Sequence, residues 1–148
     1  MTRPTTLKGS KFLIQLGDGA DPEVFTAPCA LNTKGIALSG QANEFEVDDC
    51  DDPDAPTWIE RVMRSLSGEV TGEGTLAMES WNTWNAWFTS GLEKNIRVKL
   101  DETGANNGGY FSMSAVLSSL ALTAQQRGLA QISVTLQSNG AIVWTAAA

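Results

Sequence analysis

The sequence predicts a mainly β fold, a β-sandwich or β-barrel, with one flanking α-helix. Several stretches alternate apolar and polar residues with a period of two, as Ile96, Val98 and Leu100 do in one of them. This period is typical of half-buried strands. One stretch, 80–90, instead repeats its apolar residues every three or four positions, which indicates a helix. Residues 1–148, of which 42% are hydrophobic, are numerous enough for a single domain with its own core.

The N-terminal third is expected to contain an arm, a hairpin and a long extended stretch. Residues 1–8 lack an apolar segment, and we expect them to form a flexible arm. Alternation over 10–16 predicts a strand. Glycine, aspartate and proline at 17–22 predict a turn, so that 23–26 would return as the second strand of a hairpin. A further extended stretch is predicted at 30–45.

A strongly acidic segment follows. From Glu44 to Glu60 the chain carries eight of its seventeen carboxylates and no Lys or Arg. Pro53 and Pro56 discourage regular structure there. We therefore expect a long acidic loop at about 46–62, and loops of this length inside a domain are commonly functional.

The strand predicted at 65–78 leads into the helix predicted at about 80–90. One face of this strand is apolar or glycine, and the other consists of Ser, Thr and Glu. We expect Ser80 to cap the N-terminus of the helix and Gly91 to end it. The apolar stripe of the helix is expected to pack in the core; it consists of Trp81, Trp84, Trp87 and Phe88.

Three more strands are predicted in the C-terminal third. They lie at 95–101, 110–122 and 130–137, and the middle one changes parity partway along, which indicates a bulge. Asn139-Gly140 is a hairpin signal, which would return the chain into a last strand at 142–144.

The composition argues against several function classes. There is no histidine, which removes the commonest general base and the commonest zinc ligand. The net charge is −7, whereas a protein that grips nucleic acid through its phosphates carries a basic patch. No segment resembles a signal peptide or is long enough to span a bilayer. We expect a cytosolic protein in which Cys29 and Cys50 are free thiols.

Two motifs were candidates for sites, and neither fits one well. The acidic run could hold Ca²⁺, but it lacks the glycine and final glutamate of an EF-hand loop, and Pro53 interrupts it. Paired carboxylates for catalysis and a plain solvated face are the other interpretations. Gly17-Asp18-Gly19 lacks the spacing of a phosphate-binding loop. We expect no catalytic residue, no metal site and no cofactor, and the sequence leaves open whether the acidic loop binds a cation.

Polar side chains line one face of several predicted strands, with almost no Lys or Arg among them. They are either the solvent face of a sandwich or the wall of a water-filled channel. The candidates for lining such a channel are Glu69, Thr71, Glu73, Ser112, Ser114, Gln131, Ser133, Thr135 and Gln137.

The order and character of these segments, from about Gly9 to Trp144, resemble the major tail tube proteins of siphophages and related gene transfer agents. The resemblance lies in an N-terminal strand before an irregular hairpin and in a long loop between the second and third main strands. It continues with the polar strand 67–75, which leads directly into the aromatic helix, and with two long C-terminal strands.

This resemblance implies a structural subunit of a virion tail, assembled in the cytoplasm of a host bacterium. Six copies would form a ring whose inner barrel of 24 strands takes four from each copy. Rings would stack around a tape measure protein, between a tail terminator and distal tail proteins, and double-stranded DNA would pass through without sequence-specific binding. No membrane and no enzymatic activity are implied.

The resemblance also assigns roles to charged residues. The acidic loop at 46–62 would reach a neighbouring ring, and its contact residues would be Glu46, Asp48, Asp49, Asp51, Asp52, Asp54 and Trp58. Basic side chains of neighbouring copies could neutralise the carboxylates; the candidates are Arg61, Arg64, Arg97, Lys99 and Arg127.

Other functions stay open at this point. A tail terminator or a distal tail protein would form one ring without stacking. A carbohydrate-binding module would expose the tryptophans of the helix as a stacking surface instead of burying them. An enzyme is disfavoured because the sequence shows no nucleophile–base constellation.

Overall fold

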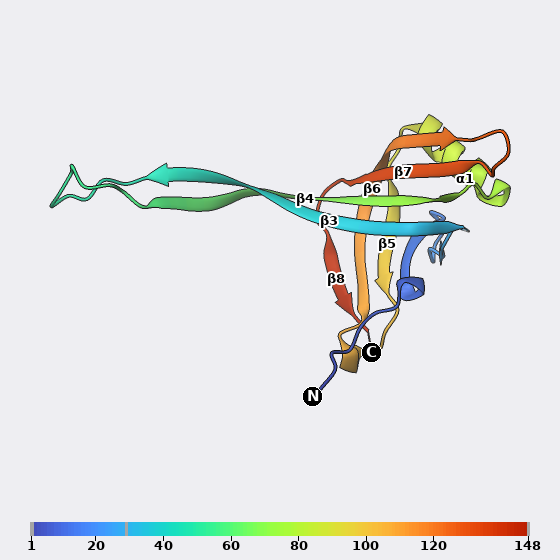
Figure 1. Cartoon of the computed structure of the whole chain (residues 1–148), viewed down its shortest axis with the longest axis horizontal. Coiled ribbons are helices and arrows are strands. Elements are labelled where there is room, and N and C mark those ends of the chain that lie inside the picture. The colour runs from blue at the N-terminus through green and yellow to red at the C-terminus, as the bar shows by residue number, and fades with distance from the viewer. Residues whose placement is uncertain (1, 29, 148) are drawn as a thin grey trace.

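The computed structural model describes residues 2–28 and 30–147. Met1, which belongs to the flexible N-terminal segment predicted at 1–8, lies outside the described residues, as do Cys29 and Ala148. The fold is mainly β with one α-helix, as predicted (Figure 1). The elements are β1 (Phe12–Gly17), β2 (Phe25–Thr26), β3 (Leu31–Glu46), β4 (Ile59–Thr75), α1 (Met78–Ser90), β5 (Lys94–Leu100), β6 (Gly109–Thr123), β7 (Gln131–Ser138) and β8 (Val143–Ala146), with short 3₁₀ turns at Gly9–Lys11 and Gly104–Asn106.

All eight strands belong to one antiparallel sheet, and not to the two separate sheets of a sandwich. The strand order is β2-β1-β5-β6-β7-β4-β3, and β8 pairs with β6. The sheet bends sharply, so that β3, β4 and β7 cross the direction of β5 and β8 (Figure 1). A single bent sheet encloses a core much as two sheets would, because its two halves face each other across the bend.

The bend lies in β6. The first half of β6 pairs with β5 on one edge and with β8 on the other, whereas the second half pairs with β7. The register shifts between Leu117 and Ser119. The parity change in the sequence predicted this bulge, and a bulge turns a strand by adding one unpaired residue.

The core fills the inside of the bend beneath α1. It includes Ile14, Val70, Ile96 and Val134, each 2% exposed or less. Each alternates along its strand with a polar neighbour, as the period-two pattern predicted. Burial of such side chains contributes roughly 1.5–3 kcal/mol each.

The helix packs through only part of its predicted stripe. Trp84 and Trp87 are buried at 1% and 4% exposure and stack with ring centroids 6.1 Å apart, while Phe88 is 48% exposed and Trp81 is half-buried. The expectation that Phe88 lies in the core is therefore wrong, because a helix of thirteen residues against one edge of a bent sheet buries only a narrow stripe.

The ends of the helix differ in how well they were predicted. The helix starts at Met78, with Ala77 in the capping position and no side-chain cap, so the predicted cap at Ser80 is wrong. Gly91 ends it in the left-handed conformation, with φ 66°, as predicted. Glycine reaches this conformation without the steric cost that a Cβ imposes.

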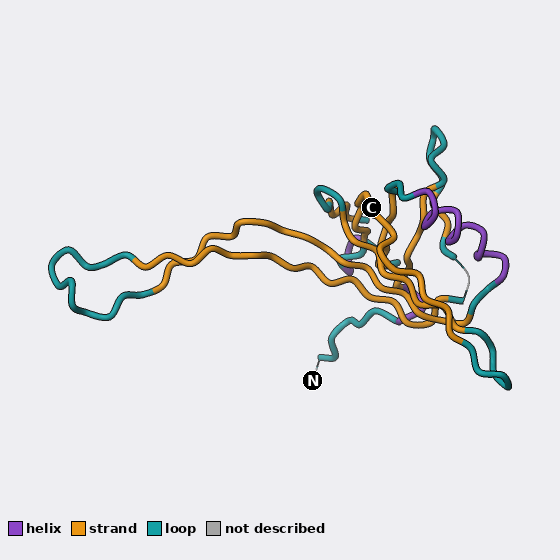
Figure 2. The backbone as a smooth tube through the Cα atoms, turned by 90° about the horizontal axis from the view of Figure 1, so that it is seen from above, coloured by secondary structure: helices purple, strands orange, loops and turns teal. Residues whose placement is uncertain are grey.

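The acidic segment is a loop over most, but not all, of its predicted length. β3 ends at Glu46 and β4 begins at Ile59, so only 47–58 is loop, and the predicted loop of 46–62 is too long. Residues 39–67 form a two-stranded ribbon with this loop at its tip, which we call the arm. It projects far from the body of the domain (Figures 1 and 2). The density of carboxylates suggested a loop. However, β4 pairs with β3 as far as the Glu46–Ile59 pair, and this pairing keeps residues 59–62 extended.

The hairpin predicted at Asn139-Gly140 is also wrong. β7 and β8 both run antiparallel to β6, one after the other along its same edge, so the chain keeps its direction. Gly140 has φ 94° and the backbone N–H of Asn139 donates to the carbonyl of Ser114 at 2.7 Å. The dipeptide thus makes a kink that follows the bend of β6. Glycine adopts a positive φ readily, and a positive φ is compatible with a kink as well as with a hairpin turn.

Candidate functional site

A polar face runs along the paired strands β4 and β7. Glu69 lies opposite Gln137, and Glu73 lies opposite Ser133. Directly opposed residues of an antiparallel pair share a face. The intervening residue Val70 points to the core with no exposed area. The structure thereby brings seven of the nine polar candidates onto one face: Glu69, Thr71, Glu73, Gln131, Ser133, Thr135 and Gln137.

The same face continues onto β3 and onto the second half of β6. Thr33 lies opposite Glu73 on β3, and Ser119 and Thr123 lie opposite Thr135 and Gln131 on β6. The sequence pattern alone did not predict these threonine and serine positions, because their strand partners depend on register and on the bulge in β6. The polar face therefore spans four strands in the order β6-β7-β4-β3, and at these paired positions its only charges are the carboxylates of Glu69 and Glu73.

The remaining two polar candidates lie elsewhere. Ser112 and Ser114 belong to the first half of β6, opposite Arg97 and Asn95 of β5, and both are half-buried. The bend in β6 separates them from the paired part of β4 and β7.

The five basic candidates lie in different surroundings. Arg61 donates from Nε to Glu44 at 3.1 Å, and Arg64 donates to the side chain of Gln41, also at 3.1 Å. Both bonds run across the arm. The exposed Arg61–Glu44 ion pair is expected to contribute about 0–1 kcal/mol.

Lys99, Arg97 and Arg127 lie away from the arm. Lys99 is 3.7 Å from the carboxylate of Asp101. Arg97 lies between the rings of Phe25 and Tyr110, 3.9 and 4.6 Å from their centroids, and its Nε is covered without a hydrogen bond. Arg127 is exposed in the turn between β6 and β7.

The tip of the arm is highly exposed. Asp49 accepts a hydrogen bond from the backbone of Asp51 at 2.9 Å, which shapes the loop locally, and the thiol of Cys50 is free and exposed. In the described part of the chain, no three His, Cys, Asp or Glu side chains gather closely enough to hold a metal ion. Trp58, beside Ile59, is 91% exposed.

Apolar side chains are exposed along the whole arm and at its root. They are Leu38, Phe45, Val47, Trp58, Ile59, Val62, Met63 and Leu66, each at least 43% exposed. An isolated two-stranded ribbon is marginally stable in water, and a large exposed apolar surface marks an interaction site. The arm therefore has the properties of a segment that is completed by a partner.

A groove of about 480 Å³ lies at the root of the arm, where the first turn after β7 approaches the ribbon. Among the residues that the structure describes, no charged side chain lines it. Its lining residues are Leu38, Ser39, Gly40, Leu66, Ser67, Phe111, Gly140, Ala141, Ile142 and Trp144.

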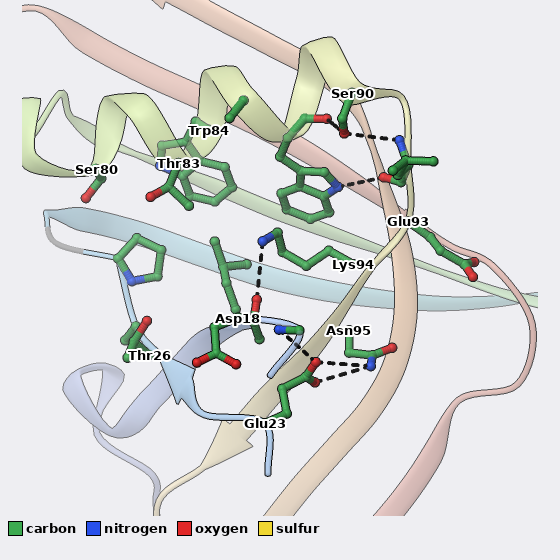
Figure 3. Close-up of a pocket in the computed structure, with 18 of the residues that line it drawn as sticks. Asp18, Glu23, Thr26, Ser80, Thr83, Trp84, Ser90, Glu93, Lys94 and Asn95 are labelled. Atoms are coloured by element: carbon green, nitrogen blue, oxygen red, sulfur yellow. Dashed lines mark hydrogen bonds between the residues drawn. The ribbon is translucent and has the colours of Figure 1, made fainter. Parts of the chain in front are cut away.

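A larger cavity, of about 900 Å³, lies between α1 and the β1–β2 turn (Figure 3). Its polar groups mostly bind their own chain. Asp18 accepts backbone hydrogen bonds from Ala20 and Val24 at 2.9 and 3.1 Å, and these bonds lower the pKa of Asp18 below its ordinary value. Glu23 accepts from Gly19 and Asn95. These carboxylates hold the turn in place, and nothing in their arrangement pairs an acid with a nucleophile.

Comparisons with known proteins agree with this architecture. The family model described as "Phage tail tube protein" matches residues 6–144. No curated protein matches the sequence. Among the residues that the structure describes, no helix has both the length and the apolar character needed to cross a membrane.

Several solved structures share the fold. A chain from the tail of an empty gene transfer agent particle, refined with C6 symmetry, is 17% identical with a TM-score of 0.79, over 95% of this chain and 100% of that one. A chain from the virion of a native gene transfer agent particle is 16% identical with a TM-score of 0.76, over the same shares. The SPP1 tail tube is 15% identical with a TM-score of 0.66, over 95% of this chain and 80% of that one.

Proposed function

Because this chain belongs to the phage tail tube protein family and is a structural subunit of a virion tail, we propose that six copies form a ring and that rings stack into a hollow tube. Double-stranded DNA passes through this tube during ejection. The protein acts by assembly and not by catalysis. The observation that carries the proposal is the four-stranded polar face with a free edge on each side.

The two free edges explain how a ring closes. On one side, β3 is the last strand of the sheet. On the other side, β5 pairs with β6 only as far as Ala115, which leaves the far edge of β6 beyond it open for pairing. An unpaired edge exposes backbone N–H and C=O groups and readily accepts another strand. Pairing β6 of one copy with β3 of the next gives four strands per copy and 24 per ring of six, and a repeated heterologous contact closes into a ring when its rotation permits.

The polar face becomes the wall of the tube in this arrangement. Its hydroxyl and amide groups keep the lumen wet. Glu69 and Glu73 place two carboxylates per copy on the wall, and therefore twelve in a ring of six. DNA binding is driven largely by cations that replace the counterions of the phosphates. A wall without Lys or Arg offers no such cations, so DNA slides through without adhering.

The arm would join one ring to the next. Its exposed apolar side chains and its acidic tip then meet a neighbouring copy, which covers the former and neutralises part of the latter. We favour Arg64 and Arg127 of neighbouring copies for this role, because Arg61 and Lys99 already pair with carboxylates of their own chain and Arg97 lies between two aromatic rings. The growing tube would surround a tape measure protein and end at terminator and distal tail proteins.

The carbohydrate-binding module and the tail terminator have less support than the tube. Of the three tryptophans that would form a carbohydrate-stacking surface on the helix, Trp84 and Trp87 are buried and Trp81 is half-buried. A terminator forms a single ring, and an arm that projects this far is better suited to stacking (Figure 1).

Negative-stain electron microscopy of the concentrated, purified chain tests the proposal. Hollow rods or stacked rings, with a pore wide enough for a duplex of ~20 Å, are expected. Isolated rings that never stack favour a terminator. Monomers that persist at high concentration contradict the tube.

A further inference from the structure

The tip of the arm carries one large side chain that its own chain leaves almost bare. Trp58 is 91% exposed and directly precedes the first residue of β4. An indole offers a large, rigid apolar area and is a frequent anchor at protein interfaces. Five of the eleven loop residues before it are aspartates, whose carboxylates keep their hydration. Trp58 is therefore the side chain of the tip that gains most from insertion into an apolar site.

The groove at the root of the arm matches such a side chain in polarity and size. Its volume of about 480 Å³ and its uncharged lining are typical of sites that enclose apolar groups. Phe111 and Trp144 contact each other there, with ring centroids 4.8 Å apart and planes tilted by 57°. Leu66, at the rim, is 78% exposed, so the groove is open to a partner.

The geometry of β4 relates the tip to the groove. The strand divides into an arm part, 59–67, and a body part, 68–75, most of which pairs with β7. At about 3.3 Å per residue, each part spans roughly 25–30 Å. A second copy that is displaced along the arm by about one body length therefore has its groove close to Trp58 of the first copy. Repetition of the same displacement gives an open stack.

We infer that Trp58 of one copy inserts into the root groove of a copy in the next ring. This inference rests on the proposed function, because the displacement that joins tip and groove is the stacking of rings. It assigns the receiving surface of the arm to residues at the root of the next arm, so that each copy contributes a tip to one neighbour and a groove to another.

Charge favours this groove over the larger cavity beside α1. That cavity is lined by four carboxylates, which belong to Asp18, Glu23, Glu79 and Glu93, and one ammonium group, that of Lys94. An acidic tip that entered it would meet like charges. At the root groove it meets no carboxylate, and Arg64 lies two residues from the rim residue Leu66.

Disulfide trapping tests the inference in the assembled protein. Thr57→Cys lies beside Trp58, and Ser39→Cys lies on the groove; both are introduced into a chain whose Cys29 and Cys50 are replaced by serine. A disulfide forms only between residues with Cα atoms within about 7 Å. The expected result is a ladder of covalently linked chains on non-reducing gels after oxidation of the tubes, with no ladder from either single-cysteine variant.

The outcomes separate this inference from the proposed function. Tubes that are visible by electron microscopy but yield no ladder overturn the docking of Trp58 and leave the tube function standing. Wild-type protein that forms no tubes overturns both. A ladder in tubes, but not in unassembled protein at the same concentration, supports the inference.

Substitution of the anchor gives an independent readout. Trp58→Ala and Leu66→Lys are expected to abolish tubes at concentrations where the wild type assembles fully, while Trp58→Phe retains them. Val24→Lys, at a side chain that is 55% exposed on the β1–β2 turn, is the matched control and should assemble normally. Because Trp58 and Leu66 are exposed in the monomer, its circular dichroism should not change. Tubes of normal length from Trp58→Ala contradict the inference.

Discussion

Arg61 of β4 donates a hydrogen bond from Nε to the carboxylate of Glu44, its direct partner on β3, at 3.1 Å. The pair joins the two strands of the arm within one chain. It shows that one of the eight carboxylates between 44 and 60 already has a cation, so that neighbouring copies need to neutralise fewer charges than the sequence suggests.

The Glu44–Arg61 pair should contribute little to the stability of the monomer. Its two side chains are 57% and 60% exposed, so water and salt screen the attraction. We expect Glu44→Gln to change the free energy of unfolding by less than about 1 kcal/mol. Urea denaturation of the monomer checks this, and a loss of several kcal/mol would show that the arm is a cooperative part of the fold.

The carboxylates of the tip should matter for assembly more than for folding. We expect Asp51→Lys with Asp52→Lys to leave the melting temperature of the monomer unchanged and to weaken tube formation, because cations of the neighbouring copy would then face like charges. Pelleting of tubes by ultracentrifugation measures the effect. Asp51→Asn with Asp52→Asn is the milder control, and unimpaired pelleting of the lysine variant would remove the trans-pairing proposal.

Positive charge on the polar face should make the tube adhesive to DNA. Glu69→Lys with Glu73→Lys supplies cations to the wall, and we expect short duplexes to co-sediment with these tubes at low salt and to dissociate as salt rises. Glu79→Lys with Glu93→Lys changes the net charge equally, at exposed positions in the first turn of α1 and just after its end. If both variants bind DNA alike, the polar face is not the lumen.

Two side chains of the helical stripe, Trp84 and Phe88, should differ strongly in their effect on stability. Trp84→Ala removes a side chain that is 1% exposed and is expected to cost about 3–5 kcal/mol, as large-to-small changes in a core do. Phe88→Ala removes one that is 48% exposed and should cost less than half as much. Chemical denaturation of both variants compares them directly, and equal losses would mean that Phe88 is covered in solution.

The β1–β2 turn should be sensitive to acid through Asp18. Backbone hydrogen bonds lower its pKa in the folded state below the ordinary value of 3.8. The folded state therefore binds fewer protons than the unfolded state, and the stabilisation is present above pH 3.8 and is lost as pH falls through the folded pKa. We expect Asp18→Asn to be less stable than the wild type at pH 7 and the difference to shrink below pH 4. Thermal unfolding across pH 2–7 measures it, and a constant difference would contradict this origin.

Local patterns in the sequence determined the elements of this protein. Alternation with a period of two located the strands, and the spacing of Trp84 and Trp87 located the helix, because each pattern follows directly from the geometry of one element. The polar face of β4 and β7 was predictable for the same reason, since alternate residues of a strand share a face whatever the strand pairs with.

Tertiary structure alone decided how the elements are joined. Strand pairing extended β4 back to Ile59, which places the acidic loop at the tip of a paired ribbon, and the bend of β6 makes Asn139-Gly140 a kink instead of the predicted turn. Both outcomes depend on contacts between residues that are distant in the chain, which no short pattern encodes. The root groove is of this kind as well: Leu66, Phe111 and Trp144 line one groove although β4, which carries Leu66, pairs with neither β6 nor β8.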